Sequence, residues 1–562
     1  MQQTTYDAIV VGSGASGGWA AKRLSEAGLK VALLEAGKSQ TDANFSEHVP
    51  AYELKYRNRA SDWIRRTRPV QRDCYACREY NYHWFANDLE EPYTTPDDKP
   101  FSWQGRMRVV GGRTNVWGRQ SYRFSQQDLK GKSFDGYGED WPLNYEDLVP
   151  YYEIVERYVG ISGQAEGVPE LPDSIFLPPM PMSCAEMQLR TRVKEKLGWT
   201  VTIGRAANLT RPINGRAACH YCGPCEQGCA THSYFNAAFT TVADALATGN
   251  TTLITDAMVY KVLTDPQTGK ATGVMYIDRN TREVREVRAR VVCLCAQALE
   301  STRILFNSAN RQFPNGLANS SGVLGHYLMD HLWVAGGASG EFPDAAGPAT
   351  PSMGGPRRPN GIYAIRMKNT MNGPREKDFI RGFGYQGGGG SNFRFGAPGF
   401  GEAYKKAVLD PVTTVSLAGF GEVLPRYDNF VAIDPNVVDV YGIPVLRITM
   451  SWGENEHAMI KSMATTAAEM MEAAGAKNIQ PYEVHNRIPG YGIHEMGTAR
   501  MGSDPKTSVL NQYLQSHDVK NLFVMDASSF VSGGCQNPTL TIMALAVRGC
   551  DYLLEEMKKG NL

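Results

Sequence analysis

The sequence predicts an α/β protein: a Rossmann-like nucleotide-binding domain with an inserted antiparallel-sheet substrate domain. First, residues 6–35 have the pattern of a strand, a glycine-rich turn, a helix and a second strand. Second, residues 326–455 change to alternating strands and Gly/Pro loops, which is typical of an antiparallel layer. Third, residues 521–558 return to a strand, a loop and a long helix. With 562 residues, the chain is long enough for more than one hydrophobic core.

The N-terminal turn carries a dinucleotide fingerprint. The strand 6–11 leads into Gly12, Gly14 and Gly17, and Glu35 ends the next strand. The first glycine makes the turn, the second lets a pyrophosphate approach the backbone, and the third lets the helix pack on the strand. A carboxylate at the end of the second strand can accept from a ribose hydroxyl. A chance glycine turn is the alternative, and the fingerprint does not separate FAD from NAD.

Elements farther along the chain follow from periodicity and turn residues. Helical patterns cover residues 144–159 and 454–474, and residues 445–450 alternate as a strand. Four consecutive glycines at 387–390 indicate a loop. The last predicted element is a helix over residues 539–558, which follows a loop.

Composition excludes several classes of partner. The 58 basic and 58 acidic side chains cancel, so charge gives no case for nucleic acid or an anionic membrane. No run of 18 or more apolar residues predicts a transmembrane segment. The N-terminus has no basic start followed by an apolar core, so we expect no signal peptide.

A short run of cysteines predicts a metal centre. Cys219, Cys222, Cys225 and Cys229 have the C-x2-C-x2-C-x3-C spacing that binds an iron–sulfur cluster. Zinc is one rival, although four-cysteine zinc sites usually consist of two separated pairs. Free thiols without a redox role are the other rival. The proline that usually follows the fourth cysteine is replaced by Ala230.

The C-terminal region favours a flavin. His494 lies in His-Glu-Met-Gly-Thr-Ala-Arg-Met-Gly, and Asn537 lies directly before the helix that begins at Pro538. A helix N-terminus can stabilise the charge that accumulates on a reduced flavin. A histidine beside the flavin can take a hydroxyl proton while hydride leaves the carbon. Taken separately, the histidine would more often be a satisfied loop residue and the asparagine a helix cap.

Together these blocks resemble the glucose–methanol–choline (GMC) oxidoreductase family. The resemblance also rests on the internal segment Arg108-Val-Val-Gly-Gly-Arg-Thr-Asn-Val-Trp117 and on Cys295-Ala-Gln-Ala-Leu-Glu-Ser-Thr-Arg303. It spans nearly the whole chain in the family's order. It implies that His494 is the general base and that Asn537 positions the substrate oxygen. Val116 stands where some pyranose oxidases carry a flavin-linked histidine, so we expect non-covalent FAD.

The resemblance also implies a set of cofactor contacts and a division of the chain. The contacts fall on the ADP half (Gly12, Gly14, Gly17, Glu35), the adenine (Val259), the diphosphate (Asp526), the flavin (Gly111, Gly112, Asn115) and its pyrimidine ring (Pro538). The FAD-binding domain is expected in three parts, the substrate domain in two, and the cysteine loop between them. These parts are 1–130, 236–325 and 486–562 for FAD, 131–215 and 326–485 for substrate, and 216–235 for the cysteines.

The activity implied is an FAD-dependent dehydrogenase that oxidises a hydroxyl of a sugar or glycoside, with a 3-keto sugar as the leading product. Electrons would leave through a 3Fe-4S or 4Fe-4S cluster. Related sugar dehydrogenases bind a three-iron form through three cysteines, and Cys219 would then be the dispensable ligand. The alternatives are a pyranose or glycoside oxidase that uses oxygen, a gluconate 2-dehydrogenase-like large subunit, and a flavin-fold subunit without substrate turnover.

Partners and location are expectations from the same branch of the family. They include a small subunit that carries the export signal and a cytochrome c or quinone acceptor. The complex would be exported folded to the periplasm. Without such a partner, the chain would be cytoplasmic.

Overall fold

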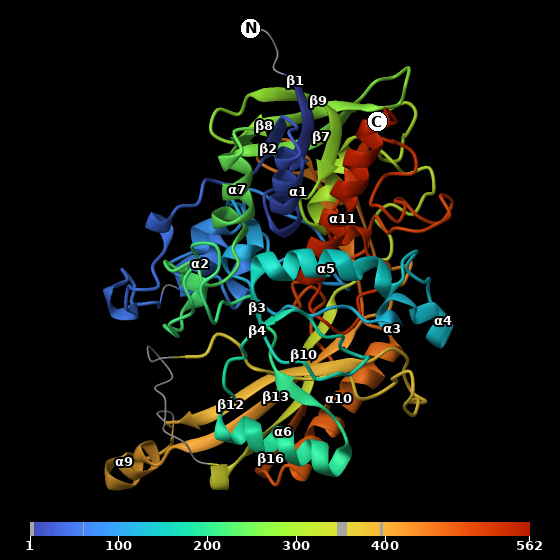
Figure 1. Ribbon diagram of the computed structural model, residues 1–562. Coiled ribbons are helices and arrows are strands. Elements are labelled where there is room, and N and C mark those ends of the chain that lie inside the picture. Colours follow the sequence, from blue (N-terminus) through green and yellow to red (C-terminus); the bar gives the residue numbers. More distant parts are fainter. Residues whose placement is uncertain (1–4, 60, 346–356, 394–396) are drawn as a thin grey trace.

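Short runs of β-branched and aliphatic residues form the strands of two main sheets. The computed structural model describes residues 5–59, 61–345, 357–393 and 397–562. In Figure 1 one sheet lies at the top of the molecule, around β1, and the other lies at the bottom, around β10 and β13. Each sheet has its own cluster of buried apolar side chains.

The first sheet has the strand order β6-β2-β1-β9-β8-β7. In addition, β17 pairs with the end of β9, at residues 292–294, beyond the part of β9 that pairs with β8. Strands β6, β2, β1, β9 and β17 run parallel, whereas β7, β8 and β9 pair antiparallel. The continuous aliphatic run of β2 is buried along its whole length, as expected for a strand covered on both faces. These strands are β1 (Thr5–Val11), β2 (Val31–Leu34), β6 (Thr251–Ile254), β7 (Ala257–Thr264), β8 (Ala271–Asp278), β9 (Val284–Leu294) and β17 (Leu522–Val524).

Helices cover this parallel sheet and confirm the Rossmann-like prediction. The helix α1 follows the glycine turn and packs against α7 and α11, and α11 packs against α5. The helices predicted at 144–159 and 539–558 are present. The helices of this part are α1 (Ala15–Glu26), α5 (Tyr145–Val159), α7 (Thr241–Ala247), α8 (Ala298–Asn307) and α11 (Thr539–Lys558).

The second sheet is antiparallel, with the order β16-β10-β13-β12-β11-β5. The helix α10 packs on β10 and β16, and α6 packs on β12. A separate hairpin joins β14 to β15. Bounds are β5 (Val201–Ile203), β10 (His331–Glu341), β11 (Ile362–Ala364), β12 (Phe383–Asn392), β13 (Val412–Glu422), β14 (Phe430–Val438), β15 (Pro444–Thr449), β16 (Lys477–Glu483), α6 (Cys184–Leu197) and α10 (Glu454–Ala473).

The predicted loop at 387–390 is wrong, because these glycines lie inside β12. A Cβ atom on Gly387 would lie 2.2 Å from the carbonyl oxygen of Ser416 on β13. The neighbouring backbone therefore leaves no room for a side chain at this strand position. Composition alone does not distinguish such a crowded strand from a flexible loop.

The remaining elements are short or peripheral. They are α2 (Ser61–Thr67), α3 (Gln126–Leu129), α4 (Gly131–Asp135), α9 (Gly401–Leu409), β3 (Ile161–Ser162) and β4 (Phe176–Leu177). None of the helices within the described ranges combines the length and apolar character that crossing a bilayer requires.

Candidate functional site

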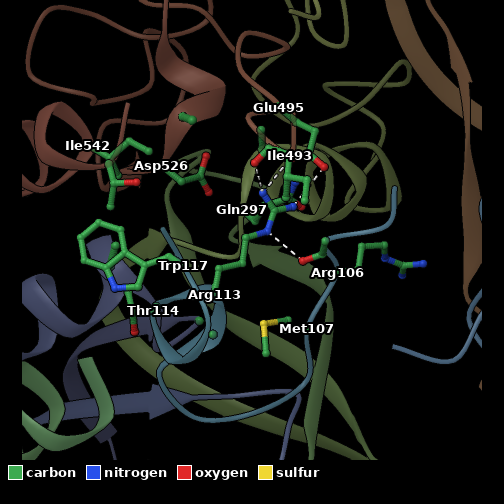
Figure 2. A pocket seen from close by; sticks show the side chains of 18 of the residues that line it. Arg106, Met107, Arg113, Thr114, Trp117, Gln297, Ile493, Glu495, Asp526 and Ile542 are labelled. Carbon is green, nitrogen blue, oxygen red and sulfur yellow. Dashed lines mark hydrogen bonds and ion pairs between the residues drawn. The ribbon is translucent and has the colours of Figure 1, made fainter. Parts of the chain in front are cut away.

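One large cavity brings together segments that lie far apart in the sequence. Its volume is about 500 Å³, within the range of cofactor and substrate pockets. The glycine turn after β1, the segment 105–120, the loop 492–495 and the start of α11 all line it. Figure 2 shows labelled side chains from the segment 105–120, the loop 492–495 and the start of α11 around the same space.

The glycine turn and Glu35 line part of the cavity. Glu35 Oε2 accepts hydrogen bonds from the backbone N–H and the hydroxyl of Ser13, and Oε1 accepts from the N–H of Gly37. A Cβ on Gly17 would lie 1.8 Å from the carbonyl oxygen of Gly12, whereas a Cβ on Gly14 would meet nothing within 4 Å. Gly17 is therefore required by helix packing, and Gly14 leaves open space beside the cavity.

The predicted contacts in the segment 111–115 divide into two groups. Gly112 lines the cavity, whereas Gly111 and Asn115 lie behind its wall. The Asn115 side chain is fully buried, and its amide donates to the carbonyl oxygens of Val110 and Gly112. Asn115 thus holds the loop in shape, and its predicted contact with a flavin stays a prediction.

The remaining cofactor positions lie on the cavity wall. Val259, Asp526 and Pro538 all line it. Burial raises the pKa of Asp526, whose carboxylate accepts hydrogen bonds from the hydroxyls of Ser301 and Ser528. Pro538 is the N-cap of α11, so the positive end of this helix dipole faces the cavity wall.

His494 lies in the wall with its tautomer fixed by a second histidine. His331 Nε2 lies 3.0 Å from the carbonyl oxygen of Gly534, which can only accept, so this nitrogen carries the proton. Burial lowers the pKa of His331 to about 4, and its ring is therefore neutral with an unprotonated Nδ1. This Nδ1 lies 3.2 Å from Nδ1 of His494, which must donate. Nε2 of His494 is then left as a proton acceptor.

The loop that carries His494 is held by a buried carboxyl group, Asp330, and by the half-buried Arg113 in its ion pair with Glu495. The carboxylate of Asp330 accepts from the N–H groups of Gly492 and His494 at 2.9 and 3.0 Å. Arg113 pairs with Glu495 and also donates to the carbonyl oxygen of Ile493, as Figure 2 shows. Burial, then His331 and Arg113, lower the pKa of His494 well below its ordinary value.

Asn537 lies in the same wall, with its amide oriented by β12. Gln386 Nε2 donates to Oδ1 of Asn537 at 2.6 Å. The amide NH₂ of Asn537 is therefore the part that can donate to a ligand oxygen. A base and a hydrogen-bond donor thus line one cavity, an arrangement suited to removing a proton from a hydroxyl.

The four cysteines of the loop line a second, much smaller cavity of about 10 Å³. Burial and the three neighbouring thiols raise the pKa of Cys222 to about 11. The set of four thiols suits an iron–sulfur cluster chemically, but the side chains do not form a ready site. Among the described residues, no group of three or more His, Cys, Asp or Glu side chains is arranged to hold a metal ion. The predicted cluster is not confirmed.

Sequence patterns do not single out Asp330, His331 or Gln386, although these residues set the geometry of His494 and Asn537. Gln386 is a lone polar residue among glycines, and His331 precedes an ordinary strand pattern. Their partners lie about 150 to 200 residues away, so local spacing carries no signal of the contact. An adjacent Asp-His pair at a strand start was the available hint.

Two family models described as GMC oxidoreductase match residues 6–333 and 425–546. The chain is 32% identical to 2-methyl-1,2-propanediol dehydrogenase of Mycolicibacterium austroafricanum, over 97% of this chain and 95% of the relative. It is 28% identical to the fructose dehydrogenase large subunit of Gluconobacter japonicus, over 99% and 98%. C-glycoside 3-oxidase of Arthrobacter globiformis is 29% identical over 55% of this chain and 54% of its own. The structure of pyridoxine 4-oxidase from Mesorbium loti shares the fold, with a TM-score of 0.59, 18% identity, and coverage of 98% and 99%.

Proposed function

Because this chain belongs to the GMC oxidoreductase family, we propose that it is an FAD-dependent dehydrogenase that oxidises a hydroxyl of a sugar or glycoside. The observation that carries the proposal is His494, whose unprotonated Nε2 shares one cavity with the amide of Asn537. Members of this family bind FAD. The glycine turn, Glu35 and the start of α11 fit that cofactor in chemistry. Val116 offers no nucleophile to the cavity, which supports non-covalent binding.

The protein's part in the reaction is to hold the substrate oxygen and accept its proton. When bound, FAD supplies the acceptor for the hydride that leaves the carbon. Nε2 of His494 takes the hydroxyl proton, and the Asn537 amide donates to the same oxygen as negative charge develops on it. His331 keeps Nδ1 of His494 protonated, so the base faces the cavity in the correct tautomer. The lowered pKa of His494 keeps the ring unprotonated and ready at neutral pH.

The substrate proposal rests on the names of relatives. Fructose dehydrogenase and C-glycoside 3-oxidase are named for sugars, which supports a sugar or glycoside hydroxyl and favours C3. The propanediol dehydrogenase is named for a small diol, so a diol is the second candidate. Both candidates place the reacting hydroxyl on a carbon that can release hydride.

A panel of glycosides, free sugars and 2-methyl-1,2-propanediol tests this proposal. We expect glycosides to bleach the flavin under anaerobic conditions, with an artificial dye sustaining turnover and NMR locating the keto group at C3. Turnover with the diol alone would replace the sugar assignment. Rapid peroxide formation in air without dye would favour the oxidase alternative.

We also propose that Cys219, Cys222, Cys225 and Cys229 would hold an iron–sulfur cluster, which would supply one-electron transfer to an external acceptor. The support is that all four thiols line one small cavity, which shares Pro359 with the large cavity. The thiols would have to rotate outward, because the present space admits about one water molecule. No step of substrate oxidation depends on this cluster.

Iron and acid-labile sulfide analysis tests the cluster directly. We expect both elements in anaerobically purified protein, and serine at Cys222 or Cys225 should remove them while sugar still reduces the flavin. Serine at Cys184, an exposed thiol on α6, is the matched control and should leave the iron content unchanged. Yellow protein free of iron would refute the cluster.

The proposal for partners and location follows the multisubunit relatives. One relative is named as a large subunit, which supports an assembly with other subunits. We propose a small signal-bearing subunit, a cytochrome c or quinone acceptor, and export of the folded complex to the periplasm. Co-purification of the native complex with its location by fractionation tests these points.

A further inference from the structure

Arg119 lies in the wall of the large cavity as a buried cation that has no carboxylate partner among the described residues. Its side chain is 4% exposed, and its Nη1 and Nη2 donate only to the backbone carbonyl oxygens of Trp117 and Pro359, at 2.7 and 3.4 Å. Its Nε–H has no acceptor among the described residues. The backbone is in the left-handed region, with φ of 60°, which is costly for a side chain of this size.

The other arginines that line this cavity are all neutralised. Arg106 lies 2.9 Å from Glu300, Arg108 lies 2.7 Å from Glu91, and Arg113 lies 2.7 Å from Glu495. Arg119 makes no such ion pair with any described residue within 4.0 Å. A guanidinium stays charged in proteins, and burying it without a counter-charge is strongly unfavourable. Unlike these three arginines, Arg119 has no carboxylate of the described residues within 4.0 Å, which leaves it able to pair with an anion in the cavity.

Two neighbours connect Arg119 to the strands that carry Gln386 and His331. Its acceptor Pro359 directly precedes the segment that pairs, through β11, with β12, the strand of Gln386. Tyr75, which also lines the cavity, contributes to raising the pKa of Arg119, and its ring lies 6.2 Å from that of Trp333, two residues after His331 on β10.

We propose that Arg119 binds the carboxylate of an acidic sugar, such as an aldonic or uronic acid, and so selects anionic substrates. This inference rests on the proposed oxidation of a sugar hydroxyl. The planar guanidinium suits a carboxylate, and its Nε–H is a donor for which the described residues provide no acceptor. A charged hydrogen bond in a desolvated wall discriminates strongly against a neutral analogue, because the analogue leaves the cation unpaired.

A rival role for Arg119 is to offset negative charge on the cysteine loop. Burial lowers the pKa of Arg119, and Cys225, which lines the small cavity, and Glu226 are the leading charges that raise it. The ring of Tyr234, which lines the small cavity, lies 5.6 Å from the guanidinium. In that role, Arg119 would tune a cluster and would be indifferent to substrate charge.

Matched substrate pairs separate the two roles. The pairs are methyl glucoside with methyl glucuronide, and glucose with gluconate, each assayed for kcat/KM with a dye acceptor. In Arg119→Gln we expect the acid-to-neutral ratio of kcat/KM to fall about 30-fold, in line with the loss of a charge-assisted hydrogen bond. Arg119→Lys should retain part of the preference. Arg357→Gln, which removes an exposed cation at the small cavity, should leave the ratio unchanged.

A binding measurement keeps this inference separate from the proposed function. Acetate, which cannot be oxidised here, should perturb the flavin spectrum of the native holoenzyme in a saturable way, and this response should weaken in Arg119→Gln. If no sugar reduces the flavin but acetate still binds through Arg119, the proposed function fails alone. The inference is overturned if neutral sugars react and acetate gives no Arg119-dependent signal. It is also overturned if Arg119→Gln alters the iron–sulfur absorbance while leaving the acid-to-neutral ratio unchanged.

Discussion

Replacing His494 by alanine should slow substrate-driven flavin reduction by about 10³-fold, the middle of the range for losing a general base. The residue supplies the only imidazole among the described residues that line the large cavity. Without it, the hydroxyl proton has no acceptor as hydride leaves. Anaerobic stopped-flow absorbance of the flavin band measures this rate, and the oxidised spectrum of the variant shows whether FAD is retained.

His485→Ala is the matched control, because this histidine is exposed and pairs with Glu483 away from the cavity. Its rate should match the parent. The parent's rate should also hold level as pH falls through 6.5, because the pKa of His494 is lowered and the base stays unprotonated until pH falls below that pKa. An acid limb above pH 6.5, or unchanged bleaching in His494→Ala, would contradict the assignment.

Two alanine substitutions in the glycine turn should fail in different ways. In Gly17→Ala the new Cβ would lie 1.8 Å from the Gly12 carbonyl oxygen, so α1 must move away from β1. We expect a loss of about 3 kcal/mol or more in the free energy of unfolding, as for severe overpacking.

In Gly14→Ala the Cβ meets no protein atom within 4 Å, and φ is −72°, so the fold should be kept. The FAD affinity should fall at least tenfold, because the methyl group occupies the space where a pyrophosphate approaches.

Thermal unfolding of FAD-free protein and titration with FAD separate these outcomes. Gly17→Ala should lower the Tm without cofactor, whereas Gly14→Ala should lower only the stabilisation that added FAD gives. Equal Tm values for Gly17→Ala and the parent would refute the packing argument. Full FAD affinity in Gly14→Ala would show that the cofactor does not approach this turn.

The presence of a nucleotide-binding sheet and a second, antiparallel sheet can be predicted from local patterns, as can the ends of the main helices. A strand, glycine turn and helix form the same unit wherever they occur, and the helix 539–558 has its apolar spacing and N-terminal proline in sequence. The glycines at 387–390 indicate a loop by composition, but they belong to a strand. The reason for glycine there is the neighbouring strand β13, which leaves no room for side chains and is not visible in the local sequence.

The sequence by itself determined the α/β fold, the nucleotide turn, and the identities of His494 and Asn537 as candidates. Only the tertiary structure decided how these two residues are oriented, through His331 and Gln386. It also decided that Arg119, in the wall of the large cavity, has no carboxylate partner among the described residues. The physical reason is distance along the chain. Hydrogen-bond direction, ring tautomer and charge compensation depend on groups that approach in space after folding, and no local spacing encodes them.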